Sequence, residues 1–87
     1  MSEIISLDEE KLESLVDRVY YHRVPNTTVT ICAITLKNGF TVVGESACID
    51  PNNFDQVIGQ QVAYNNAFEK IWQLEGYRIK SQLAEQA

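Results

Sequence analysis

The dipeptide Asn38-Gly39 constrains this chain more than any other feature of its sequence. It separates two runs rich in β-branched residues, 27–37 and 40–47, and Asn-Gly is the pair that most easily adopts the positive φ angles of a type I′ turn. The sequence therefore predicts an antiparallel hairpin with a two-residue turn, in which Leu36 pairs with Thr41 and Ile34 with Val43.

In that register both faces of the hairpin are substantially apolar. One face carries Leu36, Ile34, Val43, Cys32 and Ala47, and the other carries Phe40, Val42, Ala33, Ile31 and Val29. A lone two-stranded ribbon is unstable in water, so we expect it to be covered on both sides or joined by further strands, of which residues 20–24 could supply one. The same register puts Cys32 and Cys48 on opposite faces, which predicts two free, structural thiols.

The segment before the hairpin predicts an acidic helix. Ser6-Leu7-Asp8-Glu9 has the form of a capping box with Ser6 as N-cap, and the leucines and valines that follow predict a helix from Leu7 to about Val19. Residues 1–17 hold six acids and one base, a net charge of −5 that equals the charge of the whole chain. The rest is neutral overall, so no basic face for direct DNA or RNA binding is expected.

A long helix is predicted after the hairpin. Asp50 is a favoured N-cap, Pro51 is favoured at the first helical position, and the pattern runs to about Leu74, with Gly76 as a stop before a short helical piece over 77–83. Such a helix would be roughly 36 Å long, whereas a compact chain of this size is roughly 25 Å across. We therefore expect a homo-oligomer, a dimer or larger, that completes the helix packing.

Length and composition predict a single α+β domain over residues 1–87. No apolar run reaches the roughly 18 residues that span a membrane, and the acidic start is unlike a signal peptide, so we expect a cytoplasmic protein with no membrane partner. One histidine and two cysteines do not complete a zinc site. With no phosphate-binding loop and no nucleophile with an orienting partner, the chain is expected to be no enzyme and to hold no metal or cofactor.

Polar residues interrupt the apolar arc of the long helix. Phe54, Ile58, Phe68 and Trp72 fall near one line, and Asn65 lies inside that arc. A buried amide needs a partner, and two interpretations stay open: a hydrogen bond to the backbone or across a dimer seam, or an amide that faces a ligand between helices.

Other candidate ligand-binding residues are aromatic or cationic. Phe54 lies in the first helical turn, where a base could stack on an open ring, and Trp72 is a second aromatic candidate, although both are more typical of a core. Arg23 lies in a short loop before Pro25, and its planar guanidinium suits bidentate phosphate binding; Arg78 is a further cation near the end of the chain.

Three stretches resemble a family of small tailed-phage proteins. They are Leu36-Lys-Asn-Gly-Phe-Thr-Val-Val-Gly-Glu-Ser-Ala47, Asp50-Pro-Asn-Asn-Phe54 and Lys70-Ile-Trp-Gln-Leu-Glu-Gly-Tyr77. That family is usually described only as uncharacterised, with members in Shigella phages and N-four-like phages, and the likeness covers about residues 12–83. The resemblance implies a phage-encoded protein that acts in the cytoplasm of the infected bacterial host.

A looser resemblance concerns the small phage sponge proteins that neutralise the Thoeris defence. These proteins combine a β-ribbon sheet with long C-terminal helices and sequester cyclic ADP-ribose-type signals, and some hold cyclic oligonucleotides such as CBASS signals, between subunits. The resemblance implies that an aromatic ring, an asparagine and arginines grip the ligand, roles that Phe54, Asn65, Arg23 and Arg78 match in order. It implies a non-enzymatic anti-defence protein with a nucleotide-derived ligand.

Two other functions stay open. The acidic first helix could make the chain a protein–protein inhibitor that engages a basic surface on a host defence factor. Alternatively, the chain could be a structural accessory protein whose oligomerisation is its whole role.

Overall fold

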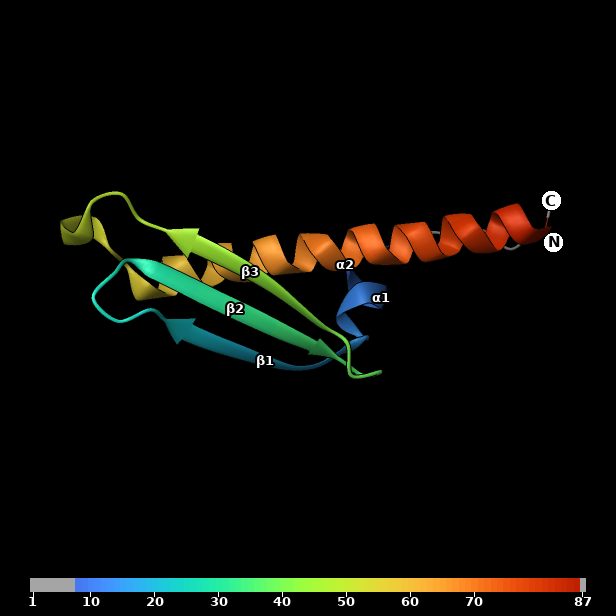
Figure 1. Cartoon of the computed structure of the whole chain (residues 1–87), viewed down its shortest axis with the longest axis horizontal. Helices are drawn as coiled ribbons and strands as arrows, with labels where there is room; N and C mark the ends of the chain where they lie inside the picture. The colour runs from blue at the N-terminus through green and yellow to red at the C-terminus, as the bar shows by residue number, and fades with distance from the viewer. Residues whose placement is uncertain (1–7, 87) are drawn as a thin grey trace.

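The computed structural model describes residues 8–86, which form two layers, a three-stranded antiparallel sheet and a long helix (Figure 1). The α+β class and the long C-terminal helix are as predicted. In chain order the elements are α1 (Glu9–Glu13), β1 (Val16–Arg23), β2 (Val29–Leu36), β3 (Thr41–Ala47), the 3-10 turn η1 (Pro51–Asn53) and α2 (Gln56–Gln86).

The first helix is shorter than predicted. Helix α1 ends at Glu13, and the strand β1 begins at Val16, so the helix expected to reach Val19 is wrong over its second half. Residues 16–21 are mostly β-branched or aromatic, and pairing along the free edge of β2 outweighs their helical spacing. The N-cap is Asp8, whose carboxylate accepts from the backbone N–H of Lys11 at 2.8 Å; Ser6 and Leu7, which we expected to begin the helix, lie outside the described residues.

The hairpin between β2 and β3 forms, but the predicted type I′ turn is wrong. Gly39 has a φ of 94°, whereas Asn38 does not adopt positive φ, and the amides of Gly39 and Leu36 bond to the carbonyls of Leu36 and Phe40 respectively. This is a three-residue connection with a bulge at glycine. It shifts the register by one residue, so Ile34 pairs with Val42, and every side chain of β3 moves to the other face.

The register shift also changes the place of the cysteines. Gly44 lies opposite Cys32, so these two residues are on the same face of the sheet. Cys48 comes an even number of positions after Gly44 and therefore continues on that face. The prediction that Cys32 and Cys48 lie on opposite faces is wrong. Cys48 lies four positions after Gly44, which is about 13 Å along an extended strand. Both thiols are free, as predicted, with Cys32 buried and Cys48 half-buried.

Helix α2 is a single rod of 31 residues, about 46 Å long. It begins at Gln56, where the Asp55 carboxylate accepts from the amide of Val57 at 2.9 Å, and Asp50 instead caps the turn η1. Gly76 does not end the helix, because one interior glycine costs only about 1 kcal/mol among good helix formers. The prediction of a separate terminal helix is therefore wrong.

Among residues 8–86 no helix is long and apolar enough to cross a bilayer.

The helix makes its closest contact with the sheet through small residues, and only part of the predicted apolar arc, Phe68 and Trp72, packs in or against the core. Ala63, Ala67 and Ile71 are buried against the sheet, whereas Ile58 and Val62 are 58% and 41% exposed. A Cβ at Gly44 would lie 2.2 Å from the backbone nitrogen of Ala67, so the helix passes directly over this glycine. The missing side chains allow an approach closer than large residues permit. The core consists of Leu12, Cys32, Ile34, Val42, Ala63, Ala67, Phe68 and Ile71.

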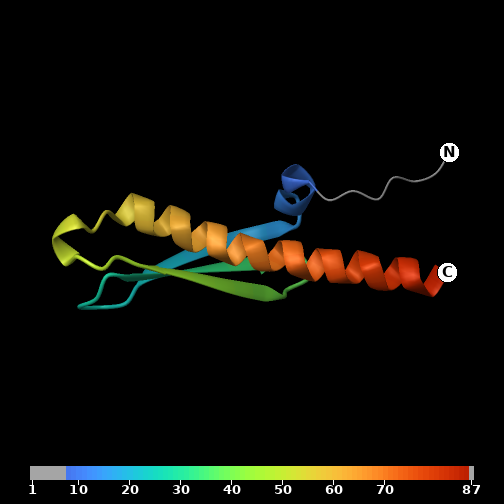
Figure 2. The same cartoon turned by 90° about the horizontal axis from the view of Figure 1, so that it is seen from above.

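Helices α1 and α2 lie on the same side of the sheet, and α2 continues well beyond the end of the strands (Figure 2). The chain measures 55 × 22 × 19 Å, and its radius of gyration of 16.1 Å exceeds the roughly 12 Å of a compact chain of this length. Within the described residues the second face of the sheet carries no helix.

Candidate ligand-binding site

Arg23 and Phe54 meet at the end of the sheet where α2 begins. The carbon at the centre of the Arg23 guanidinium lies 4.1 Å from the centroid of the Phe54 ring, within the range of a cation–π interaction. Strand β1 ends at Arg23, and Phe54 follows η1 immediately. The pairing therefore joins two segments that are 31 positions apart in the sequence.

The loop after β1 holds the arginine in place. The Nε of Arg23 donates to the carbonyl of Thr27 at 2.9 Å, and Asn26 adopts a left-handed φ of 62° that lets the loop turn. The hydroxyl of Thr28 donates to the carbonyl of Cys48 at 2.5 Å and ties this loop to the segment after β3. The guanidinium is thus oriented by the backbone, while the rest of its donors remain available to an anion.

A hollow of about 270 Å³ opens beside the Phe54 ring. Its wall on α2 is apolar, from Ile58 and Val62, whereas the opposite wall carries hydroxyl and amide groups. Together the lining residues are Thr28, Ser46, Ala47, Cys48, Asn53, Phe54, Asp55, Ile58, Gly59 and Val62.

A buried hydroxyl without a partner lies next to this hollow. Thr30 is 2% exposed, and its Oγ1 makes no hydrogen bond within the described residues. A Cβ built on Gly59 would lie 3.2 Å from that oxygen and 3.6 Å from both the Phe54 ring and the Ser46 hydroxyl. The Ser46 hydroxyl is already occupied, since it donates to the carbonyl of Gly59 at 2.7 Å. An unpaired buried hydroxyl costs about 1–3 kcal/mol, which a bound water or ligand atom would recover.

The other predicted site residues lie elsewhere. Asn65 is exposed, because it is two positions, or about 200°, from both Ala63 and Ala67, which face the sheet. The premise that Asn65 is a buried amide is wrong. Trp72 is half-buried and packs against the core rather than beside the hollow.

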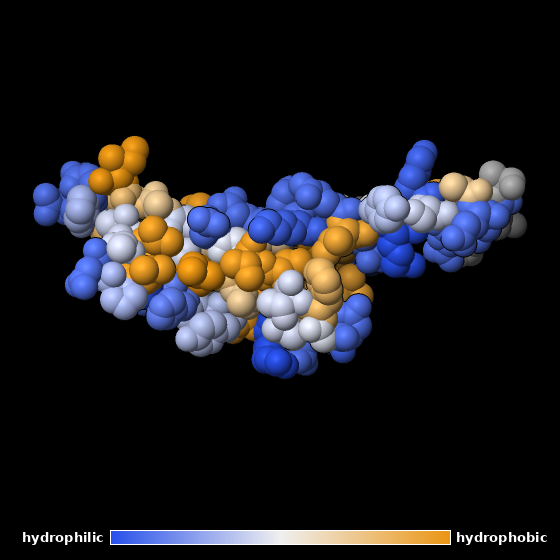
Figure 3. All heavy atoms as spheres, viewed as in Figure 1, coloured by the Kyte–Doolittle hydropathy of each residue, from blue (hydrophilic) through white to orange (hydrophobic). Residues whose placement is uncertain are grey.

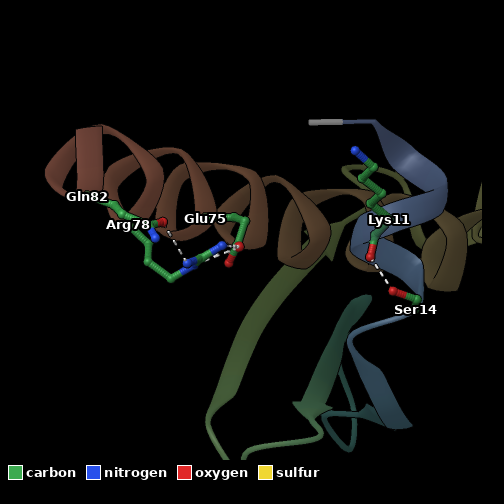
Figure 4. Close-up of polar contacts among 5 residues, drawn as sticks. All are labelled: Lys11, Ser14, Glu75, Arg78 and Gln82. Atoms are coloured by element: carbon green, nitrogen blue, oxygen red, sulfur yellow. Dashed lines mark hydrogen bonds and ion pairs between the residues drawn. The ribbon is translucent and has the colours of Figure 1, made fainter. Parts of the chain in front are cut away.

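Arg78 lies near the far end of α2, about 33 Å along the helix axis from Gln56. There its guanidinium bonds to the carboxylate of Glu75 at 2.5 Å and to the side chain of Gln82 at 3.4 Å (Figure 4). The bond to Glu75 raises the pKa of Arg78. Within one chain, therefore, only Arg23 and Phe54 of the five predicted residues come together.

The groups with reactive potential are kept apart. Strand pairing puts His22 on the face of the sheet that carries no helix and Cys32 on the face under α2, so these two residues do not form a nucleophile–base pair in one chain. Burial raises the pKa of the Cys32 thiol, which keeps it protonated and unreactive. Among residues 8–86 no three histidine, cysteine or carboxylate side chains are grouped to hold a metal ion.

No pattern in the sequence indicated the hollow itself. Its hydroxyl-bearing wall comes from the alternation of β3, and the shifted register is what turns Ser46 toward α2. A three-residue connection with its bulge at Gly39 is the alternative that predicts Ser46 on the face under α2.

The family model described as phage protein (N4 Gp49/phage Sf6 gene 66) family matches residues 7–83 of the chain. No curated protein and no solved structure matches it. The resemblance to small tailed-phage proteins is thereby confirmed, and the looser resemblance to Thoeris sponge proteins has no support from these comparisons.

Proposed function

We propose that this chain, which belongs to the phage protein family whose model it matches, is a non-enzymatic binding protein that sequesters a nucleotide-derived ligand beside Phe54. The ligand class is that of cyclic immune signals, cyclic ADP-ribose isomers or cyclic oligonucleotides, and the protein would act against host defence in the cytoplasm of the infected bacterium.

The observation that carries this proposal is the guanidinium of Arg23 stacked on the Phe54 ring beside an apolar hollow. A nucleotide needs a flat apolar surface for its base and a planar donor for its phosphate. The guanidinium covers one face of the Phe54 ring, so in this proposal the base stacks on the other face or replaces the guanidinium, which then binds the phosphate. The unpaired hydroxyl of Thr30 lies close enough to this hollow to favour a polar ligand atom or a water there.

The size of the hollow favours a contribution from a second copy. At about 270 Å³ it is smaller than the roughly 300–1,000 Å³ of typical small-molecule sites. Asn65, Trp72 and Arg78 do not reach it within their own chain, so in this proposal any contact they make with the ligand comes from another subunit of a homo-oligomer.

The proposal is tested by thermal denaturation and calorimetric titration with cyclic ADP-ribose isomers and cyclic dinucleotides. A ligand present at 100 times its dissociation constant should stabilise the protein by about 2.7 kcal/mol. Arg23→Ala should weaken binding at least tenfold. Arg18→Ala is the matched control, because Arg18 is an exposed arginine of the same strand that pairs with Asp17, and it should leave binding unchanged.

Two results would contradict the proposal. In the first, no compound of this class shifts the melting temperature; in the second, Arg18→Ala weakens binding as much as Arg23→Ala. Mass spectrometry of the ligand released by heat tests the non-enzymatic part. The ligand should be recovered chemically unchanged, and a hydrolysed product would instead identify an enzyme.

A second candidate is the acidic protein–protein inhibitor, which the exposure of the α1 carboxylates favours. Glu9, Glu10 and Glu13 are all exposed on this short helix. Reversing these three charges should abolish function in infected cells under this alternative, whereas under the ligand proposal function should survive and should be lost with Arg23→Ala.

A further inference from the structure

The face of the sheet that α2 leaves uncovered is unusually apolar for a surface in contact with water. In antiparallel sheets with one solvated face, that face normally carries polar residues in every second position. Here the central strand presents Val29, Ile31 and Ala33, and the flanking strands add Tyr20, 64% exposed, and Val43, 41% exposed. Figure 3 shows a band of hydrophobic atoms, coloured orange, over the strands, with paler and blue atoms beside it.

We propose that this face, called here the open face, is the contact surface for a second copy of the chain, with the two sheets stacked face to face. Stacked sheets pack about 10 Å apart with their strands nearly aligned, and alternating apolar residues from both sheets fill the space between them. The proposal concerns the ligand-free protein and does not depend on the ligand considered above.

Polar and charged side chains on the open face select one orientation of the second copy. Arg18 and His22 lie on β1 at one margin, and Glu45 lies on β3 at the other. A two-fold axis parallel to the strands puts β2 over the partner's β2 and β1 over the partner's β3. His22 and Glu45 both pair with Ile31, so they lie at the same level and would face each other across the interface. An axis across the strands would instead bring Arg18 against His22.

The alternative of joining two sheets edge to edge is disfavoured at β3. The side chain of Lys70 donates to the carbonyl of Val43 at 2.5 Å, and that of Asn66 donates to the carbonyl of Glu45 at 2.7 Å. These carbonyls point away from β2, so α2 already occupies the acceptors that an added strand would need.

The size of the open face sets the expected strength of the dimer. Strands of seven or eight residues are about 25 Å long, and three strands span about 14 Å including their margins. A contact this small falls among the weaker protein–protein interfaces, so we expect dissociation at micromolar concentrations.

The test is sedimentation equilibrium of the ligand-free full chain between about 1 and 500 μM. We expect a monomer–dimer equilibrium that Ile31→Glu weakens at least 100-fold. The control is Leu83→Glu, which puts the same charge on an exposed apolar residue near the end of α2, away from the sheet and from the hollow, and it should leave the dimer intact. A monomer at every concentration, or a dimer that Leu83→Glu breaks and Ile31→Glu does not, would overturn the proposal.

A charge exchange tests the orientation even where Ile31→Glu does not fold. Glu45→Lys alone should weaken the dimer about tenfold because it removes the carboxylate that faces the partner's His22. Adding His22→Glu to the same chain puts a carboxylate opposite the new lysine and should recover the wild-type constant within about threefold. A double variant no tighter than Glu45→Lys would refute the axis parallel to the strands.

Discussion

Replacement of Gly44 by alanine tests the close approach of α2 to the sheet. The added Cβ would lie 2.2 Å from the nitrogen of Ala67, 2.4 Å from the carbonyl oxygen of Ala63 and 2.7 Å from the Cα of Ala67. Carbon atoms in contact normally lie about 3.5–4.0 Å apart. All three opposing atoms belong to the helix backbone, so no rotamer change relieves the clash, and the helix must move away by about 1 Å.

The energetic cost follows from that displacement. A gap of 0.5–1 Å forfeits about a quarter to a half of each dispersion contact, and overpacked cores lose about 1–3 kcal/mol or more. We expect the upper end, about 3 kcal/mol, because the same helix also contributes Phe68 and Ile71 to the buried core. For a domain of this size such a loss lowers Tm by roughly 12–24 °C.

Urea unfolding followed by far-UV circular dichroism and by the fluorescence of Trp72 measures this effect. Gly39→Ala is the control, since its Cβ would meet nothing within 4 Å and only its φ of 94° is unfavourable, at about 1–2 kcal/mol. Adding Ala67→Gly to Gly44→Ala should give no recovery, because the clashing atoms remain. The reasoning is refuted if Gly44→Ala costs no more than Gly39→Ala, or if Ala67→Gly restores stability.

Three further outcomes are expected. Thr30→Val should raise the free energy of unfolding by about 1 kcal/mol in urea titrations, because it removes a buried hydroxyl that has no partner; a loss would reveal a bound water or ligand. Burial raises the pKa of Cys32 above its ordinary 9.0 and the pKa values of Tyr21 and Tyr64 above 10.0, so the unfolded chain loses these protons first. The free energy of unfolding should keep its full value below pH 9 and should fall as the pH rises through the pKa values of the folded protein. Unfolding curves between pH 7 and 11 measure this fall for the wild type and for Cys32→Ala. The variant should lack the part of the fall that begins at the lowest pH. Lys70→Met should increase concentration-dependent aggregation in light scattering, since it uncovers a carbonyl at the β3 edge; unchanged solubility would show that the edge is protected by other means.

The elements that local chemistry determines could be predicted from the sequence. The turn at Gly39 and the long helix after Asp50 depend on residues close together in the chain, and both occur. By contrast, residues 16–19 of β1 are predicted as the end of a helix, and only residues 20–24 are predicted as a possible strand. The spacing of residues 16–19 fits either structure, and the choice is made by pairing with β2, which offers a free edge and whose paired residues lie 7 to 20 positions further along the chain.

The register and the helix face could not be predicted for a related reason. Two-residue and three-residue hairpin connections both favour an Asn-Gly pair, and they differ by one residue in register. The face of α2 that meets the sheet is selected by Gly44, since its missing side chain lets Ala63 and Ala67 approach closely. Periodicity alone favoured the larger apolar residues, and that preference misplaced Asn65 as a buried amide.

The two proposed surfaces lie on opposite sides of the sheet, and this separates their tests. The hollow beside Phe54 is under α2, whereas the open face is on the other side, so a dimer through the open face leaves the hollow of each copy uncovered. With the axis parallel to the strands, the two helices point the same way, and Arg78 of each copy stays far from either hollow. One ligand per chain, with affinity unaffected by Arg78→Ala, would mean that each hollow binds alone. One ligand per two chains, with affinity lost in Arg78→Ala, would instead require a second interface, for which the exposed Val57, Ile58 and Val62 on α2 are the available apolar surface beside the hollow.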